Sequence, residues 1–348
     1  MLCGERCKRF PHAARRPTQD MFVTLLMEHA HIAVPLICGP MYPCSNPELV
    51  AAVSRAGALG VVQPLSLTYV HGHDFRQGLR LIHQLAEHKP IGFNALIEAS
   101  SSIYHNRMVR WVDIALEEGV RFFLTSLGNP RWVADRVHAV GGVVYHDITE
   151  RKWALKGRDG GVDGFIAVNR EAGGHTGSRD PQALLDEIGD LGLPVVAAGG
   201  VGNPTRFRDL LDMGYVGVQL GTRFIATTEC NADPAYKRAI VSANARDVVL
   251  TERLTGVPVS VLRTPYVERL GTTVSPLARW MFRGRRTKRW IRTWYALRSL
   301  RQLKQSSVAG TNQDYWQAGR SVDVIHDIRP AGDIVAELAA ALTQGVSR

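Results

Sequence analysis

Short apolar runs alternate with longer amphipathic runs through the first 230 residues of the chain. The apolar runs predict eight strands, at 34–38, 60–62, 90–96, 121–126, 142–147, 164–168, 194–198 and 216–220. The runs between them have helical spacing, and the run at Asn46-Pro47 opens with an N-cap residue followed by proline. Apolar strands separated by helices predict a parallel sheet that helices cover on both faces.

Eight strand–helix units favour closure into a (β/α)8 barrel over an open, doubly wound sheet. We therefore predict an α/β protein with a barrel at residues 31–230 and a partly helical C-terminal cover at 231–348. Active sites of such barrels lie at the C-terminal ends of the strands. The candidates at those ends are Gly39 to Met41, Asn94, Thr125, His146, the loop around His175, Gly199-Gly200 and Gly221-Thr222.

The composition indicates a globular protein of the cytoplasm. Hydrophobic residues make up 45% of the chain and charged residues 21%. The five cysteines are an odd number without paired metal-ligand spacing, so we expect a reducing compartment and no metal site. No apolar run approaches the roughly 18 residues of a membrane span. Residues 1–30 lack a signal peptide's apolar stretch, and we expect a disordered basic tail or an extension upstream of the native start.

The motif EAGGHTG, Glu171 to Gly177, places one imidazole among residues with almost no side chains. Glycines let a ligand approach the main chain closely, and a histidine there can exchange protons with whatever reacts. The alternative is a turn whose His175 merely faces water.

Two further strands run into glycine, in VVAAGGVG (195–202) and VQLGTRFIA (218–226). Barrels often bind phosphate with the loops after strands seven and eight, through exposed main-chain N–H groups. Gly199 and Gly200 would let the main chain approach a phosphate, and Thr222 would add a hydroxyl. The alternative is a tight strand-to-helix turn. The loop from Gly39 to Met41 could support a flat ring, although methionine is more often a core residue. Asn94 suits the edge of a heterocycle, or is a satisfied buried amide.

Taken together, these motifs resemble the nitronate monooxygenase family of flavin-dependent barrels. The matching pieces are PLICGPM (35–41), GFNAL (92–96), AGGHTG (172–177), VVAAGGVG and VQLGTRFIA, with TGVPV (255–259) and YWQAGRSV (315–322) as partial matches. The resemblance covers about residues 32 to 262 well and the rest in patches.

The resemblance implies FMN at the mouth of the barrel and His175 as the base that takes the α-proton of a nitroalkane. A neutral imidazole with a pKa near 6.5 suits that work. Oxygen would then complete the conversion of the nitronate to a carbonyl compound. A homodimer is left open. The implied cofactor contacts are Gly39, Pro40, Met41, Asn94, Ala172, Gly173, Gly177, Gly199, Gly200, Gln219, Leu220, Gly221 and Thr222.

Two features depart from the family pattern. Asn169 and Arg170 stand before the histidine loop, where many relatives carry glutamine and glycine. The segment 279–304 contains ten Lys or Arg residues and no acid, which equals the net charge of +10 for the whole chain. We favour a cover helix with a solvated basic face for this segment. An anionic membrane or acidic partner, or a phosphorylated thioester substrate such as a coenzyme A ester, are alternatives. Nucleic acid ranks last and is not expected as a partner.

The sequence thus leaves three functions in order. The first is an FMN-dependent nitronate monooxygenase. The second is an NAD(P)H-dependent flavin reductase that acts on an enoyl or other acyl thioester. The third is a membrane- or nucleic-acid-binding protein in which the barrel is inert.

Overall fold

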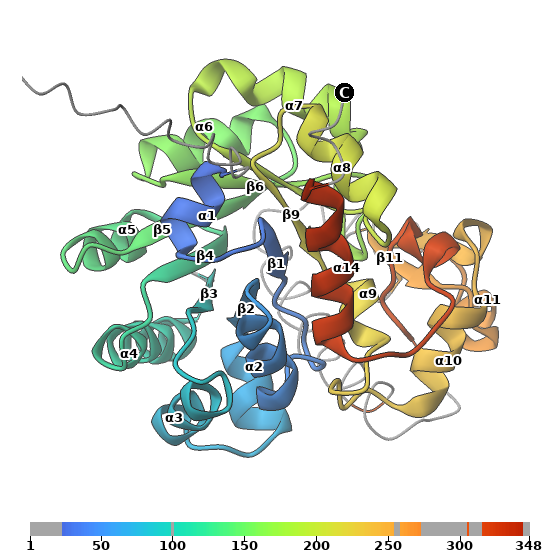
Figure 1. Ribbon diagram of the computed structural model, residues 1–348, viewed down its shortest axis with the longest axis horizontal. Coiled ribbons are helices and arrows are strands. Elements are labelled where there is room, and N and C mark those ends of the chain that lie inside the picture. Colours follow the sequence, from blue (N-terminus) through green and yellow to red (C-terminus); the bar gives the residue numbers. More distant parts are fainter. Residues whose placement is uncertain (1–22, 99–100, 254–257, 273–304, 306–314, 344–348) are drawn as a thin grey trace, which may run out of the picture.

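The predicted (β/α)8 barrel is confirmed in a computed structural model, which describes residues 23–98, 101–253, 258–272, 305 and 315–343. Eight parallel strands follow one another around a closed barrel (Figure 1). The last of them, β9, closes the ring by pairing with β1. The strands are β1 (Leu36–Cys38), β2 (Leu59–Val62), β3 (Ile91–Ile97), β4 (Phe122–Leu127), β5 (Val143–Ile148), β6 (Gly164–Val168), β8 (Val195–Ala198) and β9 (Gly217–Leu220).

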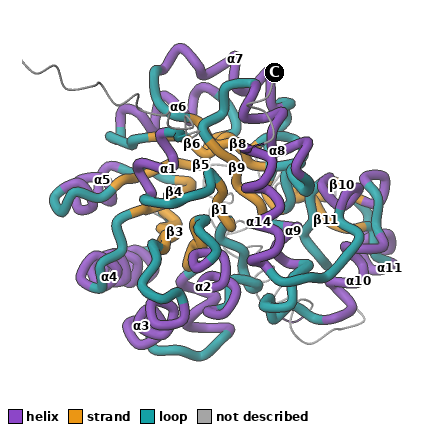
Figure 2. The backbone as a smooth tube through the Cα atoms, viewed as in Figure 1, coloured by secondary structure: helices purple, strands orange, loops and turns teal. Residues whose placement is uncertain are grey.

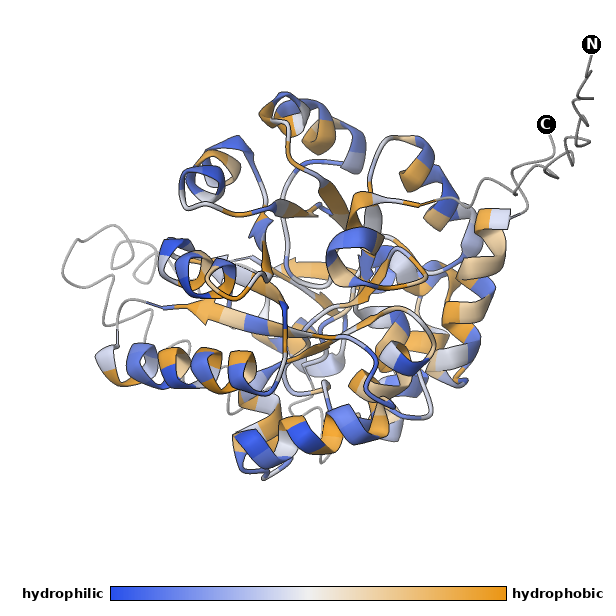
Figure 3. Cartoon of the chain, turned by 60° about the vertical axis from the view of Figure 1, so that its left-hand side comes forward, coloured by the Kyte–Doolittle hydropathy of each residue, from blue (hydrophilic) through white to orange (hydrophobic). Residues whose placement is uncertain are grey.

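Seven helices connect these strands and surround the barrel (Figure 2). Each presents apolar residues to the strands and polar residues outward, and the two kinds alternate along the outer helices in Figure 3. The helices are α2 (Pro47–Arg55), α3 (Phe75–Leu85), α4 (Ser102–Glu117), α5 (Arg131–His138), α6 (Arg151–Asp159), α7 (Pro181–Ile188) and α8 (Pro204–Asp212), with the short η1 (Ser66–Val70) before α3 and η2 (Gly189–Leu191) after α7.

The eighth position in the helical ring is taken by α14 (Ala331–Thr343), which comes from the end of the chain. It packs between α8 and α2, as the red helix of Figure 1 shows. The sequence placed this helix in a cover over the barrel mouth. It instead lies against the side of the barrel because its buried residues Ile334, Val335 and Leu338 belong to the main apolar core.

The rest of the C-terminal part follows β9. It contains α9 (Thr222–Ile225), α10 (Pro234–Ser242), η3 (Ala245–Asp247), β10 (Val248–Thr251), β11 (Val259–Leu262), α11 (Pro265–Leu270) and η4 (Arg320–Val324). Strands β10 and β11 form a small antiparallel sheet with β7 (Gly174–His175), a strand that lies between β6 and α7 in the sequence. The predicted basic segment 279–304 and residues 1–22 lie outside the described residues.

Side chains of the barrel strands alternate between two apolar clusters. One lies inside the barrel and includes Tyr145, Ile166 and Val196. The other lies between the strands and the helices and includes Val144 and Phe165. Because side chains alternate along a strand, residues two positions apart point to the same side of the barrel wall.

Helix α1 (Leu25–Ala30) packs against the inner cluster through Leu26, which is fully buried. A Cβ added to Gly217 would lie 2.3 Å from a Leu26 methyl, so the barrel provides space for this side chain. The Tyr145 hydroxyl and His29 Nδ1 are 3.1 Å apart and link the helix to β5. The sequence assigned residues 25–30 to a disordered tail, and that assignment is wrong. A six-residue helix carries too little periodicity to be recognised without its partner.

Shortening Leu26 to alanine is expected to lower the free energy of unfolding by about 2–4 kcal/mol, because a buried leucine is replaced by a cavity. Urea unfolding of the purified protein measures this. Leu25→Ala is the matched control, since Leu25 is 47% exposed and its loss should change stability by less than about 0.5 kcal/mol. Equal effects of the two changes would show that α1 is not anchored to the barrel.

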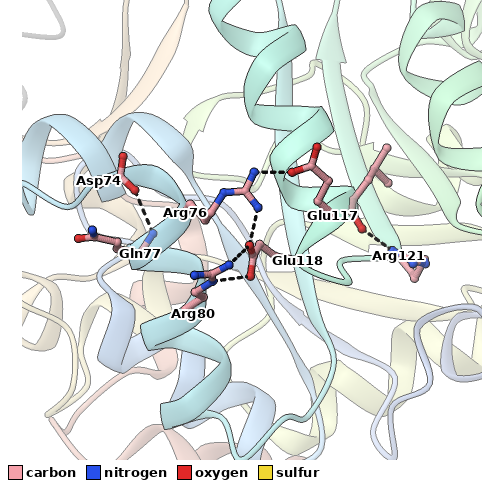
Figure 4. Close-up of polar contacts among 8 residues, drawn as sticks. Asp74, Arg76, Gln77, Arg80, Glu117, Glu118 and Arg121 are labelled. Atoms are coloured by element: carbon pink, nitrogen blue, oxygen red, sulfur yellow. Dashed lines mark hydrogen bonds and ion pairs between the residues drawn. The ribbon is translucent and has the colours of Figure 1, made fainter.

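An ion-pair cluster joins α3 to the end of α4 on the outside of the barrel (Figure 4). The Glu118 carboxylate accepts from Arg76 at 2.6 Å and from Arg80 at 2.9 Å, and Arg76 also pairs with Glu117. These guanidinium groups lower the pKa of Glu118. The arginines lie at the surface, where such pairs contribute little, so we regard the cluster as a minor brace between neighbouring helices.

Candidate active site

His175 is held in place by main-chain pairing. It forms β7 with Gly174, and the two residues pair with Val259 and Ser260 of β11. Gly174 has a φ of +71°, a conformation that L side chains rarely adopt. The imidazole is exposed to solvent, yet the protein around it lowers its pKa below the ordinary 6.5 by desolvation. A histidine in a free surface turn would keep neither this fixed backbone nor this pKa.

The motif YWQAGRSV packs directly on the histidine loop. A Cβ on Gly173 would lie 2.8 Å from the Gly319 nitrogen and 2.9 Å from the Ala318 carbonyl carbon, so the two main chains cross in close contact. The Arg320 amide donates to the Glu171 carbonyl at 2.9 Å. One wall of the loop is therefore built from a segment about 145 residues later in the chain.

The two loops predicted to bind phosphate contain main-chain N–H groups that are available as hydrogen-bond donors. Gly199 and Gly200 have φ values of +118° and +81°. Within the described part of the chain, the amides of Gly200, Gly221 and Thr222 donate to no protein acceptor. The Thr222 hydroxyl accepts from the Gly319 amide at 3.0 Å, which leaves its hydrogen free to donate. Such a set of donors fits an anionic group.

A charged pair that no sequence motif indicates borders these loops. The Glu171 carboxylate lies against Gly200, where an added Cβ would be 1.9 Å from Oε2. Arg206 of α8 pairs with the same oxygen at 3.2 Å. The guanidinium brings positive charge to the loops and offsets the carboxylate.

The inner face of the barrel mouth carries unpaired side-chain oxygens. Asn94 Oδ1 and Gln219 Oε1 are buried and have no hydrogen-bond partner in the described residues. A Cβ on Gly39 would lie 2.9 Å from the Gln219 side chain, and one on Gly221 would lie 3.4 Å from Met41 Sδ. The structure thus brings Gly39, Met41, Gln219 and Gly221 together. Buried polar atoms without partners are rare and costly, and a polar heterocycle would satisfy these.

Several residues that the resemblance implies as cofactor contacts are engaged with other parts of the protein. Leu220 points into the outer core, so only its main chain reaches this region, where its carbonyl accepts from the Gly39 amide at 2.9 Å. The Ala172 amide already donates to the Asn169 carbonyl at 3.3 Å. Gly177 packs on the Val168 carbonyl, and Pro40 is half-buried beside Gly39.

Thr125 and His146 face outward from the barrel, away from its mouth. The His146 Nδ1 lies 2.8 Å from the Thr125 hydroxyl, and its ring packs near Gly157 of α6. Burial lowers the pKa of His146 to about 4. The sequence predicted both residues at strand ends, but each is the fourth of six residues in its strand, and the alternation of side chains turns them toward the helices.

Asn169 joins the two glycine loops. Its side-chain Nδ2 donates to the Gly199 carbonyl at 3.1 Å, and its Oδ1 accepts from the Glu171 amide at 2.8 Å. Its own carbonyl accepts from the Thr176 hydroxyl at 2.6 Å. The residue is fully buried. The departure from the family pattern at this position therefore holds the histidine loop against the phosphate loop.

Asn169→Ala is expected to weaken binding of the FMN that the family resemblance implies by about tenfold to a hundredfold, because two bonds that position the loops are lost. Fluorescence quenching of FMN on addition of the protein measures the dissociation constant. Gln182→Ala, which removes an exposed amide on α7, is the control and should leave it unchanged. An unaltered constant in Asn169→Ala would show that the loops hold their positions without this side chain.

Comparison with known proteins shows the family of the chain. The sequence matches the nitronate monooxygenase family over residues 23–341. The chain belongs to the nitronate monooxygenase family. This confirms the resemblance inferred from the motifs, and the chain is accordingly an oxidoreductase of that family.

Proteins that are similar to this chain have names that indicate different activities. The chain is 32% identical over 251 residues to the (3aS,4S,5R,7aS)-5-hydroxy-7a-methyl-1-oxo-octahydro-1H-indene-4-carboxyl-CoA dehydrogenase of Mycobacterium tuberculosis, covering 71% of this chain and 68% of the relative. FabK from Thermotoga maritima superimposes with a TM-score of 0.73 at 26% identity, over 93% of this chain and 97% of that one. A nitroalkane oxidase from Streptomyces ansochromogenes gives 0.71 at 25% identity, over 92% and 98%. The substrate class is therefore not fixed by similarity.

No helix within the described ranges has both the length and the apolar character needed to cross a membrane.

Proposed function

We propose that this protein is an FMN-dependent oxidoreductase that oxidises nitronates or nitroalkanes with oxygen to carbonyl compounds. The observation that carries the proposal is the set of unpaired polar groups at the barrel mouth, where Asn169 links the Gly199 loop to the loop that carries His175. The amides of Gly200, Gly221 and Thr222 would hold the phosphate, and Arg206 would add positive charge. Asn94, Gln219, Gly39 and Met41 would contact the ring. FMN, when bound, accepts electrons from the substrate and passes them to oxygen.

His175 would act as the base. Its lowered pKa keeps the imidazole neutral at neutral pH, so a nitrogen lone pair is available to take the α-proton of a nitroalkane. The proton moves to the imidazole and the electron pair of the C–H bond moves into the nitro group, which gives the nitronate. The pairing of β7 with β11 fixes the main chain from which the ring extends.

A second candidate is a flavoenzyme that acts on an acyl thioester. It is favoured by the similarity to a carboxyl-CoA dehydrogenase at 32% identity. Both activities need the same cofactor and a base, so the site residues do not separate them. The difference lies in the electron donor and acceptor.

Rapid mixing experiments on the FMN-loaded protein separate the candidates. Loss of flavin colour on addition of propionate 3-nitronate without oxygen, with no response to NADH or NADPH, would support the nitronate reaction. Fast bleaching by a reduced nicotinamide, or by an acyl-CoA, would support the thioester reaction instead. Protein that stays colourless after incubation with FMN would contradict both.

A further inference from the structure

The carboxyl-terminal end of β5 carries a carboxyl group that faces into the barrel. Tyr145 belongs to the inner cluster, and His146 faces α6 on the outside. Asp147 is the next residue, so alternation returns its side chain to the inner face, two positions nearer the mouth than Tyr145. The strand register sets Asp147 beside Ile166 of β6.

Asp147 is half-buried, and one oxygen of its carboxyl group has no compensation for burial. Its Oδ1 is buried and has no hydrogen-bond partner in the described residues. Other carboxylates near the barrel ends are paired: Glu171 with Arg206, and Asp163 with His138 and the Val144 amide. Desolvation is the cause that raises the pKa of Asp147 to about 7. A bare carboxyl in such a place is stabilised in its neutral form.

The residues beside Asp147 on the inner face of the barrel carry no charged side chain. The β4–β5 register pairs Thr125 with His146, so Ser126 is the neighbour on β4. Ile166 and Val168 are the inward residues of β6. His146, with its pKa near 4, and Lys156 of α6 act on the outer side of the strand. Across the mouth stand Asn94 and Gln219, whose buried oxygens are acceptors. A neutral Asp147 carboxyl group can donate a hydrogen bond, whereas the oxygens of Asn94 and Gln219 can only accept one.

We propose that Asp147 is an active-site residue that contacts the bound cofactor from β5 through a neutral carboxyl group and donates a hydrogen bond to it. The inference rests on the proposed function, since it takes FMN as the group held in the mouth. It adds an acid to the site whose base is His175. Environments that raise the pKa of one group and lower that of another are typical of acid–base pairs in enzymes.

The test compares FMN binding by the wild type and by Asp147→Asn across pH. Asparagine keeps the size, the neutrality and a donor, so the variant should bind like the wild type at pH 6. Above pH 7 the wild-type carboxyl ionises, loses its donor and faces an anionic ligand, and its dissociation constant should rise by up to about tenfold per pH unit relative to the variant. The second ionisation of the FMN phosphate near pH 6 affects both proteins equally and cancels in the ratio.

Asp159→Asn is the control for removal of a carboxylate, because Asp159 is exposed at the end of α6. It should follow the wild type at every pH. If the wild type binds FMN and Asp147→Asn shows the same pH dependence, the inference about Asp147 is overturned and the cofactor assignment stands. If the wild type binds no FMN at any pH, the proposed function fails together with the inference.

Thermal unfolding without FMN gives a second readout. The folded-state pKa of Asp147 is about 7 against an ordinary value of 3.8. Folding therefore takes up a proton between these values, and this residue makes the protein less stable as pH rises from about 4 to about 7. Asp147→Asn should remove that loss, so its Tm should exceed the wild-type Tm at pH 8 by more than at pH 5. An equal difference at both pH values would show that the carboxyl is solvated in the folded protein.

Discussion

Replacing His175 with asparagine is expected to leave FMN bound and to lower kcat/KM for a neutral nitroalkane by about a hundredfold to ten-thousandfold. Asparagine keeps a polar side chain at this position, and the β7–β11 pairing uses only the main chain. The variant has no group that can take the α-proton. A preformed nitronate needs no proton removed, so its kcat/KM should fall much less.

The pH profile of the wild type supplies an independent check. The neutral imidazole is the active form, so activity on a nitroalkane should rise with pH and level off above the His175 pKa. That pKa lies below 6.5, which places the rise on the acidic side of neutrality. His138→Asn, at a partly exposed histidine on α5, should behave like the wild type. Equal losses on nitroalkane and nitronate in His175→Asn would show that the imidazole is not the base.

Gly199→Ala is expected to abolish measurable FMN binding and to destabilise the fold by about 3 kcal/mol or more. The added Cβ would lie 2.5 Å from the Ala172 nitrogen and 2.6 Å from Asn169 Oδ1, and the residue has a φ of +118°. The neighbours belong to the histidine loop, so relief of the clash must separate the two loops that hold the cofactor. Fluorescence titration and urea unfolding measure the two effects.

Two other glycines serve as controls that separate backbone strain from steric clash as causes of the lost stability. Gly192 has a φ of +74° with open space around it, so Gly192→Ala should show only the backbone strain of about 1–2 kcal/mol. Gly189 has open space and an ordinary backbone conformation, so Gly189→Ala should be close to neutral. Neither should alter FMN affinity. A Gly199→Ala protein that matched Gly192→Ala in both measurements would mean that the loops can move apart without consequence.

The barrel was predictable because its eight strands are separate apolar runs and the first seven are each followed by a helix of the outer ring. The boundaries agree closely, as at 164–168 for β6. The amphipathic pattern from Tyr69 to Glu87 predicts one continuous helix, but the chain forms η1 and then begins α3 at Phe75. Asp74 caps α3 by accepting from the Gln77 amide, a local signal that the continuous amphipathic pattern concealed.

Parts of the site depend on contacts between distant residues and could not be predicted. The strand pairing of His175 requires Val259, and the loop wall requires Gly319. Contacts between residues so far apart along the chain cannot be recognised from the local amino-acid composition. Arg206 reads as an ordinary residue of an amphipathic helix until Glu171 is placed beside it. Asp147 could have been found, because a strand that ends in Tyr-His-Asp after an apolar run must turn every second side chain inward.

The crossing of Gly173 and Gly319 has a consequence for how the enzyme matures. The loop that follows β6 gains its packing partner only when the segment around Gly319 has been synthesised and has docked. During translation the early strands can assemble while the nucleotide still lacks its full grip. Loading of the proposed FMN would then follow the docking of the segment around Gly319, which makes it a late step in biogenesis.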